Sequence, residues 1–178
     1  MLISNSYKEQ CTLLHQQDPK WGNLNKHPEL LASNLQIITN LWERQGKGTV
    51  LDYGCGKGWL AQYFPSPVQE YDPGIPGKDQ SPEPSELVIC LDVLEHIELE
   101  YLDNVLKDLQ RVTSRRGLFT IACRPATAIL PDGRNAHLII EDSDWWLKKL
   151  LNYFHIEYFT SANQSLNTVV KKLHDGTY

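Results

Sequence analysis

The chain has 178 residues, of which 41% are hydrophobic and 22% are charged, and these values exclude disorder along its whole length. Its net charge is −5 and it has no stripe of Lys and Arg, so duplex nucleic acid is excluded as the expected partner. No apolar run reaches the roughly 18 residues that a membrane span needs. A secretory signal pattern is also missing at the start of the chain, and we therefore expect a cytoplasmic protein that does not contact membranes.

Hydrophobic periodicity predicts helices that alternate with strands. In chain order, the expected elements are a helix over residues 29–44, a strand over 49–53, a helix over 59–64, strands over 68–71 and 87–91, a helix over 98–114, a strand over 117–123, a helix over 143–151 and strands over 155–160 and 168–172. The alternation indicates an α/β sheet with helices on both faces, closed by an antiparallel hairpin of the last two strands.

The chain is expected to form one domain that is preceded by an N-terminal helical segment. Residues 1–45 form an N-terminal helical segment, which could serve as a lid through Tyr7, His15 and Trp21. Residues 46–178 form the ligand-binding domain. No pattern in the sequence specifies an oligomeric state, and the four cysteines, which lack zinc-site spacing, are expected to be free thiols.

Four polar clusters each follow a predicted strand directly. Because ligands of open α/β sheets bind beyond the carboxyl ends of the strands, this placement predicts one shared site. The clusters are a glycine turn over residues 54–58, Asp72, residues 92–96 and the loop over residues 124–137.

The glycine turn follows Asp52 and precedes a short helix, as in sites that bind nucleotides. Trp59 stands where a dinucleotide fingerprint needs its third glycine, and the P-loop pattern is also not met. Residues 50–58, Val-Leu-Asp-Tyr-Gly-Cys-Gly-Lys-Gly, instead resemble the first motif of class I S-adenosylmethionine-dependent methyltransferases. The resemblance implies a Rossmann-like, mostly parallel sheet, and a turn around the methionine part of the cofactor formed by Asp52, Gly54, Cys55, Gly56 and Gly58.

In that family an acidic residue at the end of the second strand holds the ribose hydroxyls. Asp72 suits this role, because a carboxylate can accept from both hydroxyls, and Glu70 is the alternative. The chain then departs from the family, since only a Pro/Gly-rich loop over residues 73–86 precedes the next strand. We therefore expect the sheet to lack one edge strand, which leaves as adenine-contacting candidates Gly77, Lys78 and Asp79.

Residues 91–97, Leu-Asp-Val-Leu-Glu-His-Ile, are similar to the fourth-strand motif of the same family, which implies that Asp92 also contacts the cofactor. Three interpretations of Asp92, Glu95 and His96 stand side by side. Glu95 caps a helix while His96 packs under the cofactor. Alternatively, His96 is a general base for a hydroxyl or amine acceptor. In the third interpretation these residues bind a divalent metal, Mg²⁺ or Mn²⁺, with His137 as a fourth ligand.

The metal interpretation rests on a resemblance to the Glu-x-x-Glu-His site of ubiquinone-pathway O-methyltransferases and of 2′-O-methyltransferases of small-RNA termini. Asp92 replaces the usual first glutamate. The loop over residues 124–137 is expected to set acceptor specificity, with Arg124, Arg134 and His137 as substrate-binding candidates. Trp145 and Trp146 are expected to pack their helix against the sheet.

These features predict an S-adenosylmethionine-dependent methyltransferase that acts on a hydroxyl or amine of a small molecule, a nucleotide or a sugar. Alternatives from other classes are a non-catalytic S-adenosylmethionine-binding module, other chemistry on the same cofactor, and a nicotinamide oxidoreductase. A metal-assisted 2′-O-methyltransferase of an RNA terminus is a further alternative.

Overall fold

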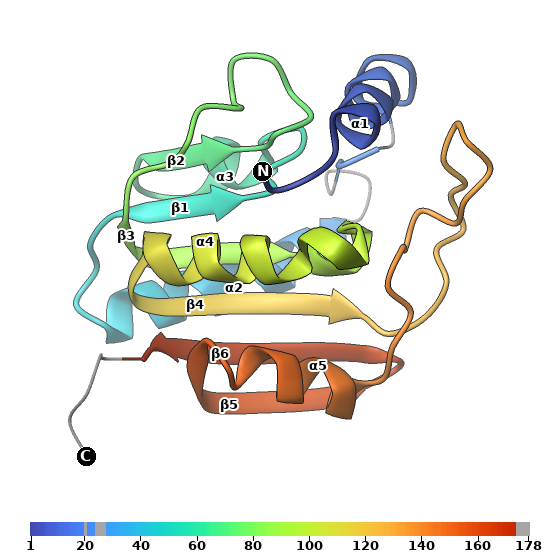
Figure 1. Cartoon of the computed structure of the whole chain (residues 1–178). Helices are drawn as coiled ribbons and strands as arrows, with labels where there is room; N and C mark the ends of the chain where they lie inside the picture. Colours follow the sequence, from blue (N-terminus) through green and yellow to red (C-terminus); the bar gives the residue numbers. More distant parts are fainter. Residues whose placement is uncertain (20, 24–27, 174–178) are drawn as a thin grey trace.

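The computed structural model describes residues 1–19, 21–23 and 28–173 (Figure 1). Its six strands form one sheet in the order β2-β1-β3-β4-β6-β5. All strands run parallel except β6, which is antiparallel to both of its neighbours. The strands are β1 (Val50–Tyr53), β2 (Val68–Tyr71), β3 (Ser85–Leu91), β4 (Thr113–Ala122), β5 (Phe154–Ala162) and β6 (Ser165–Lys172).

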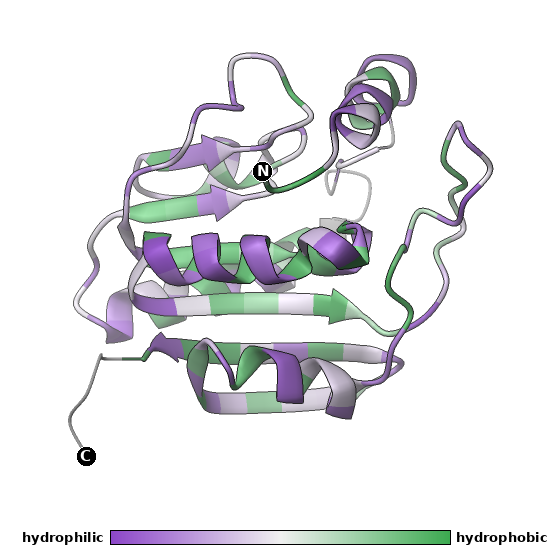
Figure 2. Ribbon diagram, in the orientation of Figure 1, coloured by the Kyte–Doolittle hydropathy of each residue, from purple (hydrophilic) through white to green (hydrophobic). Residues whose placement is uncertain are grey.

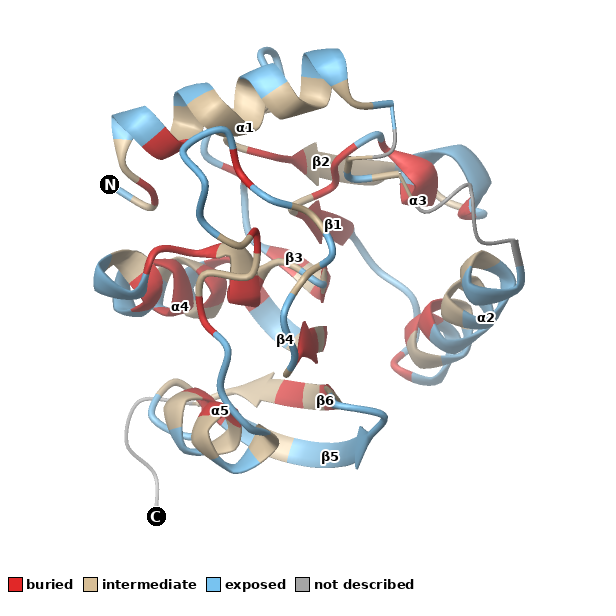
Figure 3. Ribbon diagram, turned by 90° about the vertical axis from the view of Figure 1, so that its right-hand side faces the viewer, coloured by how far each residue is buried: buried red, intermediate tan, exposed pale blue. Residues whose placement is uncertain are grey.

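Helices cover both faces of this sheet (Figures 1 and 3). α4 and α5 lie on one face and α2 and α3 on the other, while α1 lies across the end of the sheet near β2. The helices are α1 (Asn5–Gln17), α2 (Pro28–Arg44), α3 (Trp59–Tyr63), α4 (Leu102–Val112) and α5 (Ser143–Leu150), with short 3₁₀ turns η2 (Leu94–His96) and η3 (Leu99–Tyr101).

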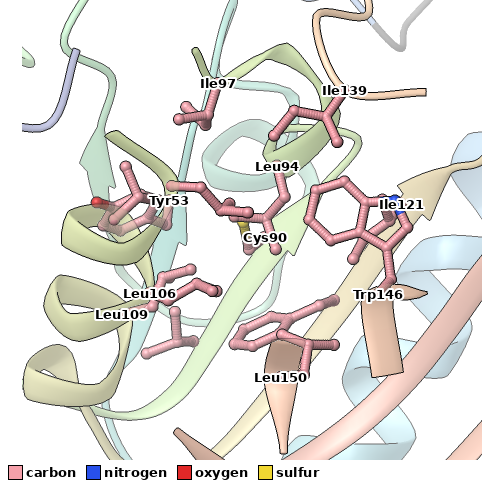
Figure 4. Packing of buried hydrophobic residues seen from close by; sticks show 14 of the residues in the cluster. Tyr53, Cys90, Leu94, Ile97, Leu106, Leu109, Ile121, Ile139, Trp146 and Leu150 are labelled. Atoms are coloured by element: carbon pink, nitrogen blue, oxygen red, sulfur yellow. The ribbon is translucent and has the colours of Figure 1, made fainter. Parts of the chain in front are cut away.

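The alternation of side chains along the strands divides the core into two layers. In β3, Val88 and Cys90 belong to the layer under α4 and α5, whereas Leu87 and Ile89 belong to the layer under α2 and α3. Figure 4 shows side chains of both α4 and α5 gathered around Cys90. In Figure 2, hydrophobic residues occupy the middle of β4, while α4 carries hydrophilic residues as well. The central strands β1 and β3 are thus buried on both faces, whereas the edge strand β2 is mostly half-buried.

The prediction of an amphipathic helix near residues 98–114 is confirmed for its apolar face, but its ends differ. Its buried side chains are those that the periodicity predicts: Leu102, Val105, Leu106, Leu109 and Val112. The helix starts later, after the 3₁₀ turn η3, and it ends at Val112 because Thr113 already belongs to β4. The Thr113 hydroxyl donates to the Leu109 carbonyl at 2.7 Å, so the helix passes into the strand without a loop.

Several strand boundaries also differ from the predictions, and β4 begins at Thr113 and not at residue 117. β3 begins at Ser85, inside the predicted loop, because Glu86 accepts hydrogen bonds from the backbone and hydroxyl of Thr49, both at 2.6 Å. The predicted C-terminal hairpin is present and longer than expected. Asn163 and Gln164 form its turn with φ values of 52° and 56°, the left-handed pair that two-residue hairpins favour.

The described helices include none that is both long and apolar enough to cross a membrane.

Substitution of the core residue Phe119 tests this packing. Phe119 is fully buried and its ring lies 5.4 Å from that of Phe154. We expect Phe119→Ala to lower the free energy of unfolding by about 3–5 kcal/mol, because it removes apolar contacts and leaves a cavity. Phe159→Ala, at a position on β5 that is 50% exposed, is the matched control and is expected to cost less than about 1 kcal/mol. Urea unfolding measures both, and equal losses would contradict the packing described.

Candidate functional site

The polar side chains singled out in the sequence meet at one edge of the sheet. Asp72 follows β2, Asp92 follows β3, and Arg124 comes two residues after β4. Figure 3 looks onto this edge, where the loops that follow the parallel strands lie beside α1. Ligands of open parallel sheets bind at such an edge.

The glycine turn after β1 has a backbone conformation that glycine permits. Gly54 and Gly56 have φ values of 80° and 51°. A Cβ on Gly54 would lie 2.4 Å from Cγ2 of Val93, so no side chain fits there. The amides of Gly54 and Cys55 donate to the Tyr71 carbonyl at 2.7 and 3.0 Å. The turn is therefore tied to the end of β2 and packed against the segment after β3.

Gly22 contacts this turn directly, although no pattern in the sequence predicts the contact. Its carbonyl oxygen accepts a hydrogen bond from the Lys57 amide at 2.9 Å. A Cβ on Gly56 would lie only 2.5 Å from the same oxygen. The segment after α1 thus packs backbone to backbone against the turn. No local signal could have revealed the contact, because the two glycines are distant in sequence and neither has a side chain.

Asp72 is buried and joins three parts of the site. Its carboxylate accepts hydrogen bonds from the amides of Gly56 and Gly74, at 3.0 and 2.9 Å. Nε2 of His15, on α1, lies 3.7 Å from Oδ2 of Asp72. Burial lowers the pKa of His15, and the Asp72 carboxylate opposes this shift. Because each carboxylate oxygen can accept more than one hydrogen bond, Asp72 retains capacity for the hydroxyls of a ligand.

Asp52 is a second buried carboxyl group in β1. Its Oδ2 has no hydrogen-bond partner among the described residues. Burial, followed by the carboxylates of Glu70 and Asp72, raises the pKa of Asp52 to about 7. Glu70, the alternative to Asp72 in the sequence analysis, forms an ion pair with Lys78 at 2.9 Å. Asp72 therefore keeps its carboxylate for the site, while that of Glu70 is paired with a lysine.

Glu95, His96 and His137 come together as one cluster. One ligand atom from each lies within 4.8 Å of the others. Oε1 of Glu95 accepts from the Ala122 amide at 2.8 Å, whereas its Oε2 is buried without a partner among the described residues. Burial, followed by the charge of Asp92, raises the pKa of Glu95 to about 8.

The two imidazoles of this cluster have defined tautomers. Nδ1 of His96 lies 2.8 Å from the Ala136 carbonyl, and Nδ1 of His137 lies 2.5 Å from the Arg124 carbonyl. Since a carbonyl only accepts, each Nδ1 carries a proton and Nε2 keeps its lone pair in the neutral ring. Burial and the neighbouring His137 lower the pKa of His96 to about 4, so His96 is neutral near pH 7.

Asp92 stands apart from this cluster, although it is only three residues from Glu95. Its backbone has a left-handed φ of 53°, and its Oδ1 accepts from the Thr120 hydroxyl at 2.9 Å. It is not one of the three cluster residues. The structure therefore brings together three of the four predicted metal ligands and places Asp92 in the cavity wall instead.

The two predicted substrate-binding arginines are exposed, and neither is among the residues that line the two cavities described below. Arg124 donates to the Ser165 hydroxyl at 3.2 Å. Arg134 pairs with Asp132 at 2.7 Å and lies 5.9 Å from the centre of the Tyr7 ring. Arg134 thus packs the loop after β4 against α1.

Two adjoining cavities open among these residues. The first has a volume of about 170 Å³, and its wall includes Ile3, Tyr7, His15, Asp72, Val93 and Ile97. The second, of about 240 Å³, has Asn34, Cys55 and Trp59 in its wall. Both are lined by Gly22, Gly54, Asp92 and His96. The Trp21 ring lies between those of His15 and His96, at 6.4 and 5.6 Å, so all three predicted lid residues line the first cavity.

Other predicted cofactor residues lie around these cavities or outside them. Gly58 is the N-cap residue of α3 with a φ of 75°, and Cys55 is buried. The adenine candidates line neither of the two cavities. Lys78 is paired with Glu70 and Asp79 with Lys8. A Cβ on Gly77 would have no other residue within 4 Å beyond its chain neighbours.

Comparison with solved structures identifies the fold. The N-methyltransferase NodS from Bradyrhizobium japonicum WM9, in complex with S-adenosylhomocysteine, has a TM-score of 0.66 and 11% identity over 93% of this chain and 100% of its own. The chain has the class I methyltransferase fold. The predicted Rossmann-like sheet, short by one edge strand and closed by an antiparallel hairpin, is confirmed.

Other structures with the methyltransferase fold support the same assignment. The 1,6-didemethyltoxoflavin-N1-methyltransferase of Burkholderia thailandensis has a TM-score of 0.62 and 14% identity over 94% of this chain and 87% of its own. The magnesium protoporphyrin IX methyltransferase of Synechocystis PCC 6803 has a TM-score of 0.56 and 20% identity over 83% of each chain. No protein-family model and no curated protein sequence matches this chain.

The raised pKa of Asp52 predicts a pH-dependent stability. The folded-state pKa of about 7 exceeds the unfolded value of about 3.9, so the folded state binds the extra proton between these values. Protonation of Asp52 therefore contributes to the free energy of unfolding. This contribution is complete below about pH 4 and is lost as the pH rises through 7. Relative to Asp52→Asn, we expect the wild type to lose on the order of 1 kcal/mol of unfolding free energy per pH unit between about pH 5 and 7.

Urea unfolding at several pH values measures this difference. Asp144→Asn, an exposed position on α5, is the control and should follow the wild type. A gap between the wild type and Asp52→Asn that stays constant with pH would contradict the buried state of this carboxyl group.

Proposed function

We propose that this protein is an S-adenosylmethionine-dependent methyltransferase that acts on a hydroxyl or amine of a small molecule, a nucleotide or a sugar. The observation that carries the proposal is the meeting of the glycine turn and the buried Asp72 in one cavity at the carboxyl edge of the sheet. The fold supports it, because solved structures with S-adenosylhomocysteine bound share that fold.

The residues present fit the cofactor. Asp72 offers two acceptor oxygens for the ribose hydroxyls, and the glycine turn allows close approach of the methionine part. The unpartnered Oδ2 of the buried Asp52 is an acceptor for a ligand's positively charged ammonium group. When bound, the cofactor supplies an electrophilic methyl group on a sulfonium, which is already a good leaving group. Catalysis by this chain then comes chiefly from proximity and alignment.

His96 is the proposed general base. Its Nδ1 is held by the Ala136 carbonyl, which leaves Nε2 as the acceptor nitrogen, and its side chain lines the first cavity; its low pKa keeps the ring neutral near pH 7. A neutral imidazole can accept the proton that a hydroxyl or amine loses as it is methylated. Glu95 acts as a positioning residue, because its carboxyl group holds the end of β4 through the Ala122 amide.

A non-catalytic cofactor-binding module is the rival class. A sensor needs only the cofactor pocket, so a second cavity and a paired-imidazole cluster beside it favour an enzyme. The net charge of −5 favours small acceptors over duplex nucleic acid.

Cofactor binding through Asp72 is tested by calorimetry with S-adenosylhomocysteine. We expect saturable binding to the wild type and an affinity about a hundredfold lower for Asp72→Ala, because hydrogen bonds from ligand hydroxyls to a buried carboxylate are lost. Asp144→Ala is the surface control and should bind as the wild type does. Circular dichroism checks that each variant is folded. Absence of binding to the wild type would refute the proposed function, and incubation with labelled S-adenosylmethionine and candidate acceptors then tests turnover.

A metal-assisted reaction on a hydroxyl, as at an RNA terminus, is the second candidate function. The observation that favours it is the cluster of Glu95, His96 and His137, in which one ligand atom of each residue lies within 4.8 Å of the others and Oε2 of Glu95 is buried without a partner among the described residues. Such donors fit Mn²⁺ or Mg²⁺, and backbone carbonyls hold both imidazoles as they do in metal sites. A cation there would lower the pKa of a bound hydroxyl. Against it, Asp92 lies outside the cluster.

Mn²⁺ titration followed by electron paramagnetic resonance separates the metal and general-base interpretations. If the cluster binds metal, chelator-treated wild type takes up one Mn²⁺ per chain and His137→Ala takes up none. His155→Ala, an exposed histidine on β5, is the control and should retain the site. Uptake by neither protein would leave His96 as a general base that acts without a metal.

A further inference from the structure

We propose that α1 and the residues before it form the wall of a nucleobase site in the first cavity, which takes the adenine of the cofactor. The proposal rests on the proposed function and deepens it. It assigns the base to Ile3, Tyr7 and Cys11, and not to the loop candidates Gly77, Lys78 and Asp79.

The side chains that line the first cavity are polar near Asp72 and mainly apolar elsewhere. Near Asp72 its wall contains His15 and the glycine turn, which suit a sugar and its polar substituents. Elsewhere its wall is formed mainly by apolar side chains from two segments: Ile3, Tyr7 and Cys11 on one, Val93 and Ile97 on the other. A purine is a flat ring with two largely apolar faces. Contact between these apolar side chains and the faces of a purine is favourable.

The covalent structure of a nucleoside links these two regions. A base is joined to its ribose by a single bond, so a ribose held at Asp72 must place its base within the same cavity. Pro73 and Gly74, directly after Asp72, also line this cavity. A Cβ on Gly74 would lie 2.8 Å from Cβ of Cys11, so α1 and this loop are in close contact. The base cannot pass between them, and the apolar part of the cavity is where it fits.

The spacing along α1 matches such a ligand. Tyr7, Cys11 and His15 are four residues apart, so all three lie on one face of the helix. From Tyr7 to His15 the helix rises about 12 Å, which is enough to run alongside both a sugar and a base. His15 lies at the Asp72 end, and Tyr7 lies at the other end.

Polar contacts to three different loops hold α1 in place. The backbone amide and hydroxyl of Ser4 both donate to Glu98, at 2.8 Å each, and Lys8 pairs with Asp79 at 2.9 Å. Gln10 donates to Asp132 at 3.0 Å. These partners follow β3, β2 and β4, respectively. These contacts fix α1 in its position beside the first cavity.

Alkylation of Cys11 in the wild-type protein tests the proposal without any mutation. Cys11 and Cys123 are both half-buried free thiols, and Cys55 and Cys90 are fully buried. Only Cys11 lines the first cavity, so Cys123 is an internal control. Burial raises the pKa of both thiols, to about 11 for Cys11, so iodoacetamide is applied near pH 9 and both rates are followed by mass spectrometry.

Adenosine at ten times its Kd is expected to slow the alkylation of Cys11 about tenfold and to leave Cys123 unchanged. S-adenosylhomocysteine should protect in the same way, whereas free methionine, which has no base, should not. Protection by methionine but not by adenosine would overturn the proposal, because the cavity would then hold the amino-acid part or an acceptor.

Calorimetry with two variants gives an independent measurement. Ile3→Ala and Tyr7→Ala should each bind both adenosine and S-adenosylhomocysteine about tenfold more weakly, through lost apolar and aromatic contact. Leu13→Ala is the matched control, since Leu13 is on α1 and 44% exposed outside the cavity. Tyr7→Phe keeps the ring and should bind within about twofold of the wild type.

The outcomes separate this inference from the proposed function. If the wild type binds S-adenosylhomocysteine while Cys11 remains unprotected and Ile3→Ala keeps full affinity, the α1 wall is refuted and the methyltransferase assignment stands. If the wild type binds neither S-adenosylhomocysteine nor adenosine, both are refuted.

Discussion

A single buried carboxylate, that of Asp72, connects the parts of the chain that make the site. It accepts hydrogen bonds from Gly56 in the glycine turn and from Gly74 in the loop after β2, and His15 brings α1 to the same oxygen as Gly56. Without the carboxylate, two backbone amides would be left without partners in a buried environment, which is costly. The shape of the first cavity therefore depends on the same group that is proposed to grip the cofactor sugar.

The site also contains two buried carboxyl groups that the fold itself does not satisfy. Asp52 and Glu95 each have one oxygen without a partner among the described residues, and burial raises the pKa of both. A protein optimised only for stability would not keep such groups, because burying an unpaired carboxyl group is unfavourable. Their position at the carboxyl edge of the sheet follows the general tendency of perturbed groups to gather where ligands bind.

Sequence patterns predict the parallel core and the glycine turn well, because these depend on local features. Apolar runs specify β1 and β3, and the face of α4 is set by residues three and four apart. The contacts of α1 could not be predicted in this way. Ile3, Tyr7 and Gly22 have partners that are close only in the folded chain, and the periodicity of the helix is weak because its inner face lines a cavity. Likewise, Asp92 and Glu95 are neighbours in sequence, yet the left-handed backbone at Asp92 and the turn η2 separate them.

The anchoring of α1 has a consequence for the order in which the molecule assembles. The hydrogen bond of Ser4 joins it to Glu98, which lies 94 positions later in the sequence. That of Gln10 joins it to Asp132, which lies 122 positions later. Contacts across such long separations form late, after the local ones. α1 therefore finds these partners late in folding, and until then the apolar side chains of Ile3 and Tyr7 remain uncovered. A nascent chain released before β4 is complete would carry this helix without its full set of attachments.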